Sequence, residues 1–270
     1  MGNENEKPLE RLVSDGGFCG IFRTIGCVGD SLSSGEFEAT NPDGTAAYID
    51  MYEYSWGQFL ARMAGCTVRN FSRGGMTAKE YCDTFAAENG FWDADRACQA
   101  YIIAMGVNDI TYMEEKYDGK VGSAADVCKE DYTKNKRSFA GYYAQIVQRL
   151  KKIQPKAKFF LMTLPEEGHT EKKREYIAEH TKLMYEFAGL FENTYVLDFG
   201  KYAPAYDADF KEKFFLASHM NPCGYIVTAK LVASYIDYII RHNMADFKQV
   251  GFIGTDYVHV ETEKNIILKK

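Results

Sequence analysis

The sequence predicts an α/β fold in which helices cover both faces of a mainly parallel β-sheet. Segments rich in β-branched and aromatic residues alternate with segments whose apolar residues recur at helical spacing, which is typical of βαβ units. The chain has 270 residues, of which 46% are hydrophobic and 14% aromatic. This length and apolar content are sufficient for a buried core and exclude a disordered chain.

Five short segments are predicted to form strands, at 22–28, 67–71, 100–105, 158–164 and 195–199. Between and after them, apolar residues at helical spacing predict helices at 54–63, 139–153, 172–191 and 224–241. The helix over 139–153 ends in basic residues, which the helix dipole favours, and Pro155 then prevents its continuation.

Two segments fall outside this alternation. Residues 110–138 are polar and interrupted by glycines, so we expect an excursion over the active-site end of the sheet. The tail 244–270 contains GFIGTDYVHVETEKNIIL, for which we expect a hairpin or extra strands. We find no internal repeat, and we expect one domain over 1–270 with its core at about 22–241 and a C-terminal extension at 244–270.

The charge and the spacing of metal-binding residue types exclude several classes of partner. The 32 Lys and Arg residues against 38 Asp and Glu residues give a net charge of −6, which repels phosphate backbones. We therefore expect no nucleic-acid partner. The five histidines and seven cysteines form no CxxC or HExxH motif, so neither a metal site nor a cofactor is predicted.

The N-terminal residues MGNENEKPLERLVSDGG are polar and contain no apolar signal-peptide core. Apolar runs such as 159–164 are too short to span a bilayer. An odd number of scattered cysteines fits reduced thiols better than a disulfide framework. We therefore expect a cytoplasmic protein with no membrane partner, and a trimmed secretion signal is the alternative.

Ligands of parallel α/β sheets bind beyond the carboxyl ends of the strands, so the residues after each predicted strand are the candidates for chemistry. Ser31 follows the first strand in GDSLS, where its hydroxyl would need a base to become a nucleophile. Gly75 follows the second strand in NFSRGGMT, and glycines there allow a backbone N–H to approach a ligand closely. Taken alone, these motifs equally fit a helix cap and a tight turn.

Two further candidates come later in the chain. Asn108 follows the third strand in GVND, where its side-chain amide can donate to an oxyanion or merely cap a helix. His219 lies in SHMNPCGY, just before the last long helix, and imidazole is the natural proton acceptor near neutral pH.

Together and in this order, the four motifs resemble those of the SGNH family, also called GDSL hydrolases. The resemblance covers about residues 22–241 and includes the HxNxxGY run that starts at His219. It implies that Ser31 is the nucleophile, Gly75 a backbone donor and Asn108 a side-chain donor of the oxyanion hole, and His219 the base. It also implies a three-layer α/β/α, flavodoxin-like fold with about five parallel strands, and chemistry that needs no cofactor.

One residue departs from the family pattern. The family usually has an aspartate three residues before the histidine, whereas this chain has Leu216 in LASH. An orienting acceptor holds the imidazole in its useful tautomer. We expect a Ser31–His219 dyad whose histidine is oriented by a main-chain carbonyl near Leu216, or by an acid from elsewhere such as Asp207 or Asp209. The alternative is a site that has lost catalysis and binds a ligand.

The substrate prediction rests on charge. The segment 29–57 contains no Lys or Arg and six acidic residues, namely Asp30, Glu36, Glu38, Asp43, Asp50 and Glu53. This segment is either a solvated loop or a pocket rim that disfavours anionic substrates, and Asp30 itself can bond its own turn. We expect a serine ester hydrolase acting on small acyl esters, with deacetylation of carbohydrates as the candidate reaction. A thioesterase or lysophospholipase acting on longer chains is the alternative, although no amphipathic lid is recognised.

The remaining histidines, His169, His180, His242 and His259, are expected to have surface or capping roles.

Overall fold

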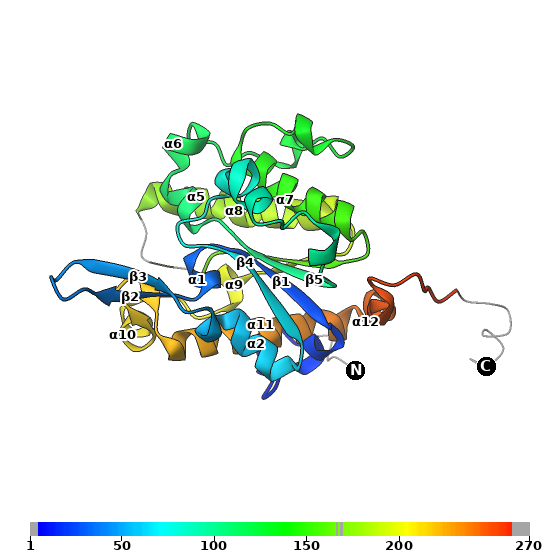
Figure 1. Ribbon diagram of the computed structural model, residues 1–270, viewed down its shortest axis with the longest axis horizontal. Coiled ribbons are helices and arrows are strands. Elements are labelled where there is room, and N and C mark those ends of the chain that lie inside the picture. Colours follow the sequence, from blue (N-terminus) through cyan, green and yellow to red (C-terminus); the bar gives the residue numbers. More distant parts are fainter. Residues whose placement is uncertain (1–4, 166, 168–169, 261–270) are drawn as a thin grey trace.

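The computed structural model describes residues 5–165, 167 and 170–260. At its centre lies a five-stranded parallel sheet with the order β4-β1-β5-β6-β7 (Figure 1). The strands are β1 (Thr24–Gly29), β4 (Thr67–Ser72), β5 (Ala100–Ala104), β6 (Lys158–Met162) and β7 (Thr194–Leu197). This is the flavodoxin-like strand order, so the predicted fold class is confirmed.

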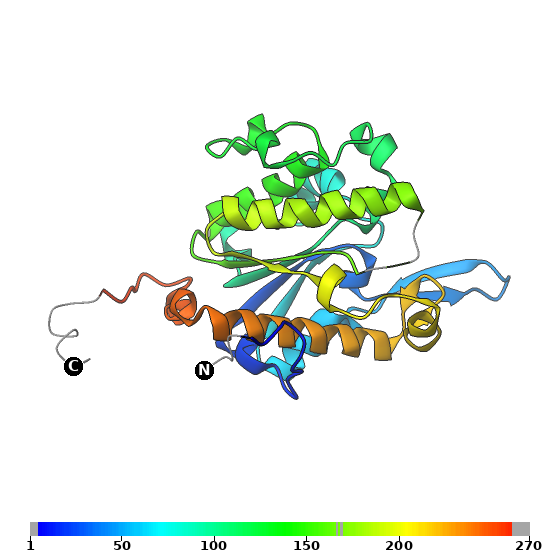
Figure 2. The same ribbon diagram turned by 180° about the vertical axis from the view of Figure 1, so that it is seen from behind.

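Helices cover both faces of the sheet (Figures 1 and 2). On one face lie α2 (Trp56–Ala64) and α11 (Pro222–His242), and on the other lie α7 (Phe139–Ile153) and α8 (Glu171–Leu190). Each face has its own apolar core, and the residues of β5 and β6 are buried along nearly their whole length. Two covered faces explain why these strands lack an alternating polar pattern.

Helix α11 is long and apolar enough to cross a membrane, which the sequence prediction did not anticipate. Most of its apolar window is buried, 72%, where it packs against α2 and the sheet. It therefore serves as the core helix of this layer. Asn221 caps its first turn by accepting a hydrogen bond from the Gly224 N–H, and Pro222 follows at the first helical position.

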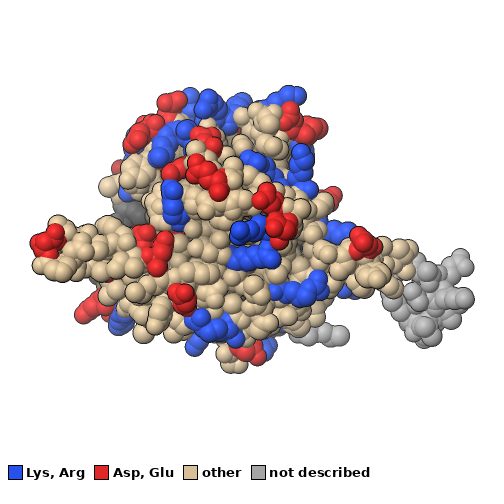
Figure 3. All heavy atoms as spheres, viewed as in Figure 1, with Lys and Arg blue, Asp and Glu red and all other residues tan. Residues whose placement is uncertain are grey.

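The segment after β1 differs from the prediction. A hairpin of β2 (Glu36–Thr40) and β3 (Ala46–Asp50) projects from the sheet, with a turn at Gly44, whose φ is +87° (Figure 1). Acidic side chains mark the tip of this projection, whereas both charge signs are interspersed over the rest of the visible face (Figure 3).

The excursion over 110–138 begins within α5 (Val107–Thr111) and continues as α6 (Met113–Tyr117), η5 (Ala124–Asp126) and η6 (Tyr132–Lys134). The predicted hairpin in the tail is wrong for 244–260, which forms α12 (Met244–Phe247), η7 (Val250–Phe252) and an extended end without strand pairing; 261–270 lie outside the described residues. All seven cysteines lie in the described part and are free, as expected.

The other elements are short and connect the layers. They are η1 (Gly17–Ile21), α1 (Ser31–Ser34), η2 (Tyr52–Tyr54), α3 (Ala78–Glu80), η3 (Tyr81–Phe85), α4 (Ala86–Glu88), η4 (Ala94–Arg96), α9 (Phe199–Tyr202), α10 (Ala208–Phe214), β8 (Phe215–Leu216) and β9 (His219–Met220).

Candidate active site

Three of the four predicted residues lie at the carboxyl ends of adjacent strands. Ser31 is the first residue of α1 and is separated from the end of β1 by Asp30 alone. Gly75 lies in the turn after β4, and Asn108 lies in α5 after β5. Because β1 is paired with β4 on one side and β5 on the other, these three turns meet at one edge of the sheet.

The turn that carries Ser31 is tightly constrained. Asp30 caps α1, and its Oδ1 accepts a hydrogen bond of 3.1 Å from the Leu32 N–H, the local role considered for this residue. A side chain at Gly29 would bring a Cβ to 2.3 Å from Ser33 Oγ, so only glycine fits there. Ser31 is half-buried, and its hydroxyl forms no hydrogen bond with any residue that the structure describes.

The two turns expected to supply the oxyanion donors are joined by hydrogen bonds. Asn108 Nδ2 donates to the Met76 carbonyl at 3.2 Å, and Asp109 Oδ1 accepts from the Ala78 N–H at 2.8 Å. Gly75 has a φ of +70° and is exposed, with open space around it. The second N–H of the Asn108 amide and the exposed backbone at Gly75 can therefore face the same ligand.

His180 lies beneath one of these turns. Its Nε2 is 3.0 Å from the Met105 carbonyl oxygen, and a Cβ at Gly106 would lie 2.8 Å from the same nitrogen. Burial lowers the pKa of His180 to about 4, so the ring is neutral near pH 7. The expected surface role is wrong for this residue, because α8 turns its ring inward against Phe139 and Tyr143.

His219 contacts two carboxylates rather than Ser31. Its Nε2 lies 3.2 Å from Glu36 Oε1, and its Nδ1 lies 3.6 Å from Glu38 Oε2. The Ser218 hydroxyl is 3.0 Å from Nδ1. Although β9 contacts α1, no hydrogen bond joins His219 to Ser31 in the described part of the chain.

The two acids suggested for orienting His219 are engaged elsewhere. Asp207 caps α10 by accepting from the Phe210 N–H at 2.9 Å, and Asp209 pairs with Lys213 at 2.7 Å. Leu216 is exposed and pairs with His219 only through the backbone ladder of β8 and β9. The carboxylates that do reach the ring come from β2, on a hairpin that the sequence analysis missed.

The other histidines lie away from this site. His242 Nδ1 is 2.8 Å from the Tyr238 carbonyl oxygen at the end of α11, and His259 is exposed in the tail. His169 lies outside the described residues.

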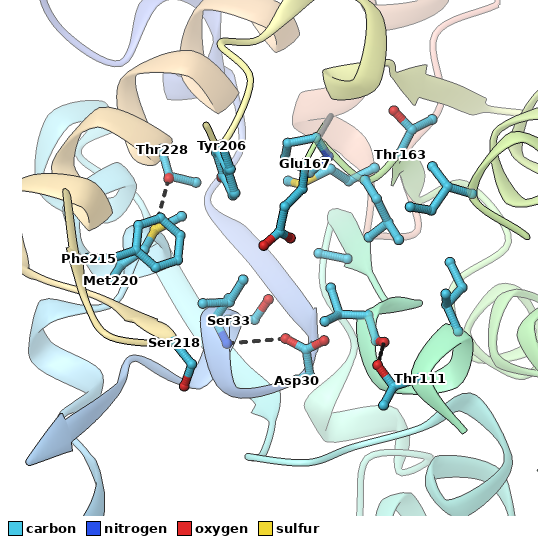
Figure 4. Close-up of a pocket in the computed structure, with 18 of the residues that line it drawn as sticks. Asp30, Ser33, Thr111, Thr163, Glu167, Tyr206, Phe215, Ser218, Met220 and Thr228 are labelled. Atoms are coloured by element: carbon cyan, nitrogen blue, oxygen red, sulfur yellow. Dashed lines mark hydrogen bonds between the residues drawn. The ribbon is translucent and has the colours of Figure 1, made fainter. Parts of the chain in front are cut away.

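A pocket of about 350 Å³ lies beside the turn that carries Ser31 (Figure 4). Asp30 and Ser33 line it, and Asp30 Oδ2 and Ser33 Oγ are buried without a hydrogen-bond partner among the described residues. Burial raises the pKa of Asp30 to about 7. Neither Ser31 nor His219 lines this pocket, whose remaining walls are largely apolar, with Leu32, Trp56, Val107, Ile110, Met162 and Leu164 among them.

A doubly covered parallel sheet with Ser, Gly and Asn at neighbouring strand ends and a His beside them is the arrangement of an SGNH-type hydrolase. Residues 27–226 match the model of the GDSL-like lipase/acylhydrolase family, and the chain belongs to this family. Membership supports an esterase or acylhydrolase activity. No curated protein sequence matches the chain.

Solved structures with the same fold include several carbohydrate esterases. A family 3 carbohydrate esterase from Clostridium thermocellum is 16% identical with a TM-score of 0.52, and the alignment covers 81% of this chain and 97% of that one. A family 2 carbohydrate esterase with a carbohydrate-binding domain, from Corynascus thermopiles, is 15% identical with a TM-score of 0.53, covering 87% and 69%. The acetyl xylan esterase AlAXEase is 16% identical with a TM-score of 0.50, covering 79% and 99%.

Proposed function

We propose that this protein is a serine ester hydrolase that acts through an acyl-enzyme on small acyl esters, with acetyl esters of carbohydrates as the first candidates. The observation that carries the proposal is the meeting of Ser31, Gly75 and Asn108 at the ends of three adjacent strands. His219, on β9 in contact with α1, is the nearby group suited to take a proton.

The first half of the reaction forms the acyl-enzyme. Ser31 Oγ attacks the ester carbonyl carbon while its proton passes to His219 Nε2. The carbonyl oxygen becomes an oxyanion, which receives hydrogen bonds from the backbone N–H groups of Ser31 and Gly75 and from the Asn108 amide. The ester C–O bond then breaks, and the alcohol leaves with the proton from His219.

The second half regenerates the enzyme. A water molecule attacks the acyl carbon and gives a proton to His219, and the same donors stabilise the second oxyanion. Collapse releases the carboxylic acid and returns the proton to Ser31. The chain's own residues carry every proton transfer in this sequence.

Charge near the base favours neutral substrates. Glu36 and Glu38 lie beside His219, so an anionic acyl or leaving group would meet two carboxylates there. Neutral sugar esters avoid this repulsion. The carbohydrate esterases that share this fold, one of them an acetyl xylan esterase, support the same choice of substrate.

A thioesterase or lysophospholipase is a second candidate, favoured by the pocket beside Ser31. Its apolar lining, which includes Leu32, Val107 and Leu164, could hold a chain longer than acetyl. A non-catalytic binding module is a third candidate, favoured by the contact of His219 Nε2 with Glu36 instead of Ser31.

A chain-length series of nitrophenyl esters, from acetate to decanoate, tests these candidates on the wild type beside Ser31→Ala. We expect the highest kcat/KM with acetate and loss of turnover in Ser31→Ala. A maximum at long chains would favour the second candidate. Equal rates in the two proteins would refute the serine-hydrolase proposal.

A further inference from the structure

His219 lies between two carboxylates carried by one strand. Glu36 and Glu38 are two residues apart on β2, so their side chains project from the same face of the hairpin. The His219, Glu36 and Glu38 side chains are only 13%, 15% and 20% exposed. Water therefore screens the interactions of the imidazole with the two carboxylates only weakly.

On the Nδ1 side, a serine hydroxyl connects the imidazole to Glu38. Ser218 Oγ donates to Glu38 Oε2 at 2.6 Å and lies 3.0 Å from His219 Nδ1. The Ser218 hydroxyl has one hydrogen, which it donates to Glu38. Ser218 Oγ can therefore only accept a hydrogen bond from His219, whose Nδ1 carries the proton. The Ser218 N–H also donates to Glu38 Oε2 at 3.0 Å. These hydrogen bonds from Ser218 lower the pKa of Glu38 and keep it ionised.

This chain of hydrogen bonds favours the tautomer that a serine hydrolase requires. A proton held on Nδ1 leaves the lone pair of Nε2 free to accept the proton of the nucleophile. When Nε2 takes that proton, the positive ring faces the Glu38 carboxylate through Ser218. The aspartate that the family pattern has at the position of Leu216 would supply the same acceptor directly.

On the Nε2 side, Glu36 occupies the nitrogen that the nucleophile must use. Glu36 Oε1 lies 3.2 Å from Nε2. Its other oxygen, Oε2, would be only 2.0 Å from a Cβ atom added at Gly74. Gly74 therefore leaves the room that this carboxylate takes. Because a carboxylate can only accept a hydrogen bond, its contact with Nε2 competes with the Ser31 hydroxyl for that nitrogen.

We propose that Glu38, acting through Ser218, is the positioning acid of His219. Glu36 restrains the same imidazole, because its carboxylate must leave Nε2 before Ser31 can use that nitrogen. The proposal rests on the proposed function of Ser31 and His219. It predicts opposite effects for two glutamates on one strand: turnover falls when Glu38 loses its charge and rises when Glu36 does.

The test is the hydrolysis of nitrophenyl acetate by single variants. We expect Glu38→Gln and Ser218→Ala each to lower kcat about 10- to 100-fold, by analogy with the loss seen when the hydrogen-bond partners of metal-ligating histidines are removed. KM should change by less than about 2-fold, because neither residue touches the substrate. Ser218→Thr keeps the hydroxyl and should keep most of the activity. Glu36→Gln should raise kcat by about 2- to 10-fold, the range that corresponds to the net free energy of one competing hydrogen bond.

Two combinations separate positioning from a merely structural role. The double variant Glu38→Gln with Ser218→Ala should lose no more than either single variant, because both break one chain of hydrogen bonds. Adding Leu216→Asp to Glu38→Gln should restore turnover. Asp43→Asn removes the same charge at the hairpin tip, where the side chain accepts hydrogen bonds from Thr45, and should change neither kcat nor KM.

Unchanged turnover in folded Glu38→Gln, or no recovery on adding Leu216→Asp, would overturn the role of Glu38. A fall in Glu36→Gln equal to that in Glu38→Gln would overturn the restraint by Glu36. Circular dichroism confirms folding of each variant, and Ser218→Thr beside Ser218→Ala decides the matter if a glutamate variant does not fold. Failure of the proposed function is a separate result, since Ser31→Ala would then match the wild type.

Discussion

Asp30 makes the stability of this protein depend on pH. Its side chain is 2% exposed, its Oδ1 caps α1, and its Oδ2 has no hydrogen-bond partner among the described residues. Burial away from water raises its pKa from 3.8 to about 7. Because the pKa is higher in the folded state, the protonated carboxyl favours folding below about pH 4, and this contribution is lost as the pH rises to 7.

The size of the effect follows from the pKa change. At 1.36 kcal/mol for each pKa unit, the loss between pH 4 and pH 8 is roughly 4 kcal/mol. Asp30→Asn keeps the cap and the size of the side chain but cannot ionise. We therefore expect the unfolding free energy of the variant to gain on that of the wild type by roughly 3 kcal/mol between pH 4.5 and pH 8.

Urea unfolding at several pH values between 4.5 and 8 measures this difference. Burial also raises the pKa of Asp109, to about 6, so the variant should keep a smaller slope of the same sign. Asp43→Asn, at the exposed hairpin turn, is the control and should follow the wild type over this range. A difference between Asp30→Asn and wild type that does not change with pH would refute the reasoning.

Three further predictions concern the site and its support. Asn108→Ala should lower kcat on nitrophenyl acetate about 10²- to 10³-fold with little change in KM, because it removes an oxyanion donor; an unchanged kcat would exclude that role. Gly29→Ala should reduce the free energy of unfolding in urea by about 1–3 kcal/mol, because its Cβ would clash with Ser33 and with the Ala104 carbonyl. Gly251→Ala is the control and should not reduce it, because the space around Gly251 is open. Leu216→Asp in the wild type should change turnover by less than about 3-fold, because Glu38 already provides the acceptor; a large gain would show that no acid acts on His219.

The sequence predicts the layers of this fold well because their signals are local. The apolar spacing over 139–153, with Pro155 after it, predicts α7 with the bounds that the structure has. The three site residues after β1, β4 and β5 follow from the rule that parallel strands present their carboxyl ends together.

The environment of His219 depends on a contact that crosses the chain. Glu36 and Glu38 alternate with Phe37, which packs against Tyr54 and Tyr225. The turn signal NPDG follows, so a hairpin could have been predicted in this segment. The contact between the acidic face of this hairpin and a histidine about 180 residues later could not be predicted, because no local sequence pattern encodes that pairing. The inward position of His180 was hidden for the same reason, since it depends on the packing of α8 against α7.

The nucleophilic role of Ser31 is the central claim, and covalent labelling tests it most directly. The protein is incubated with a serine-directed phosphonate, digested and mapped by mass spectrometry. We expect one adduct, on Ser31, with slower labelling in His219→Ala because the proton acceptor is gone. An intact Ser31 peptide under conditions where the protein hydrolyses esters, or an adduct on another serine, would contradict the account.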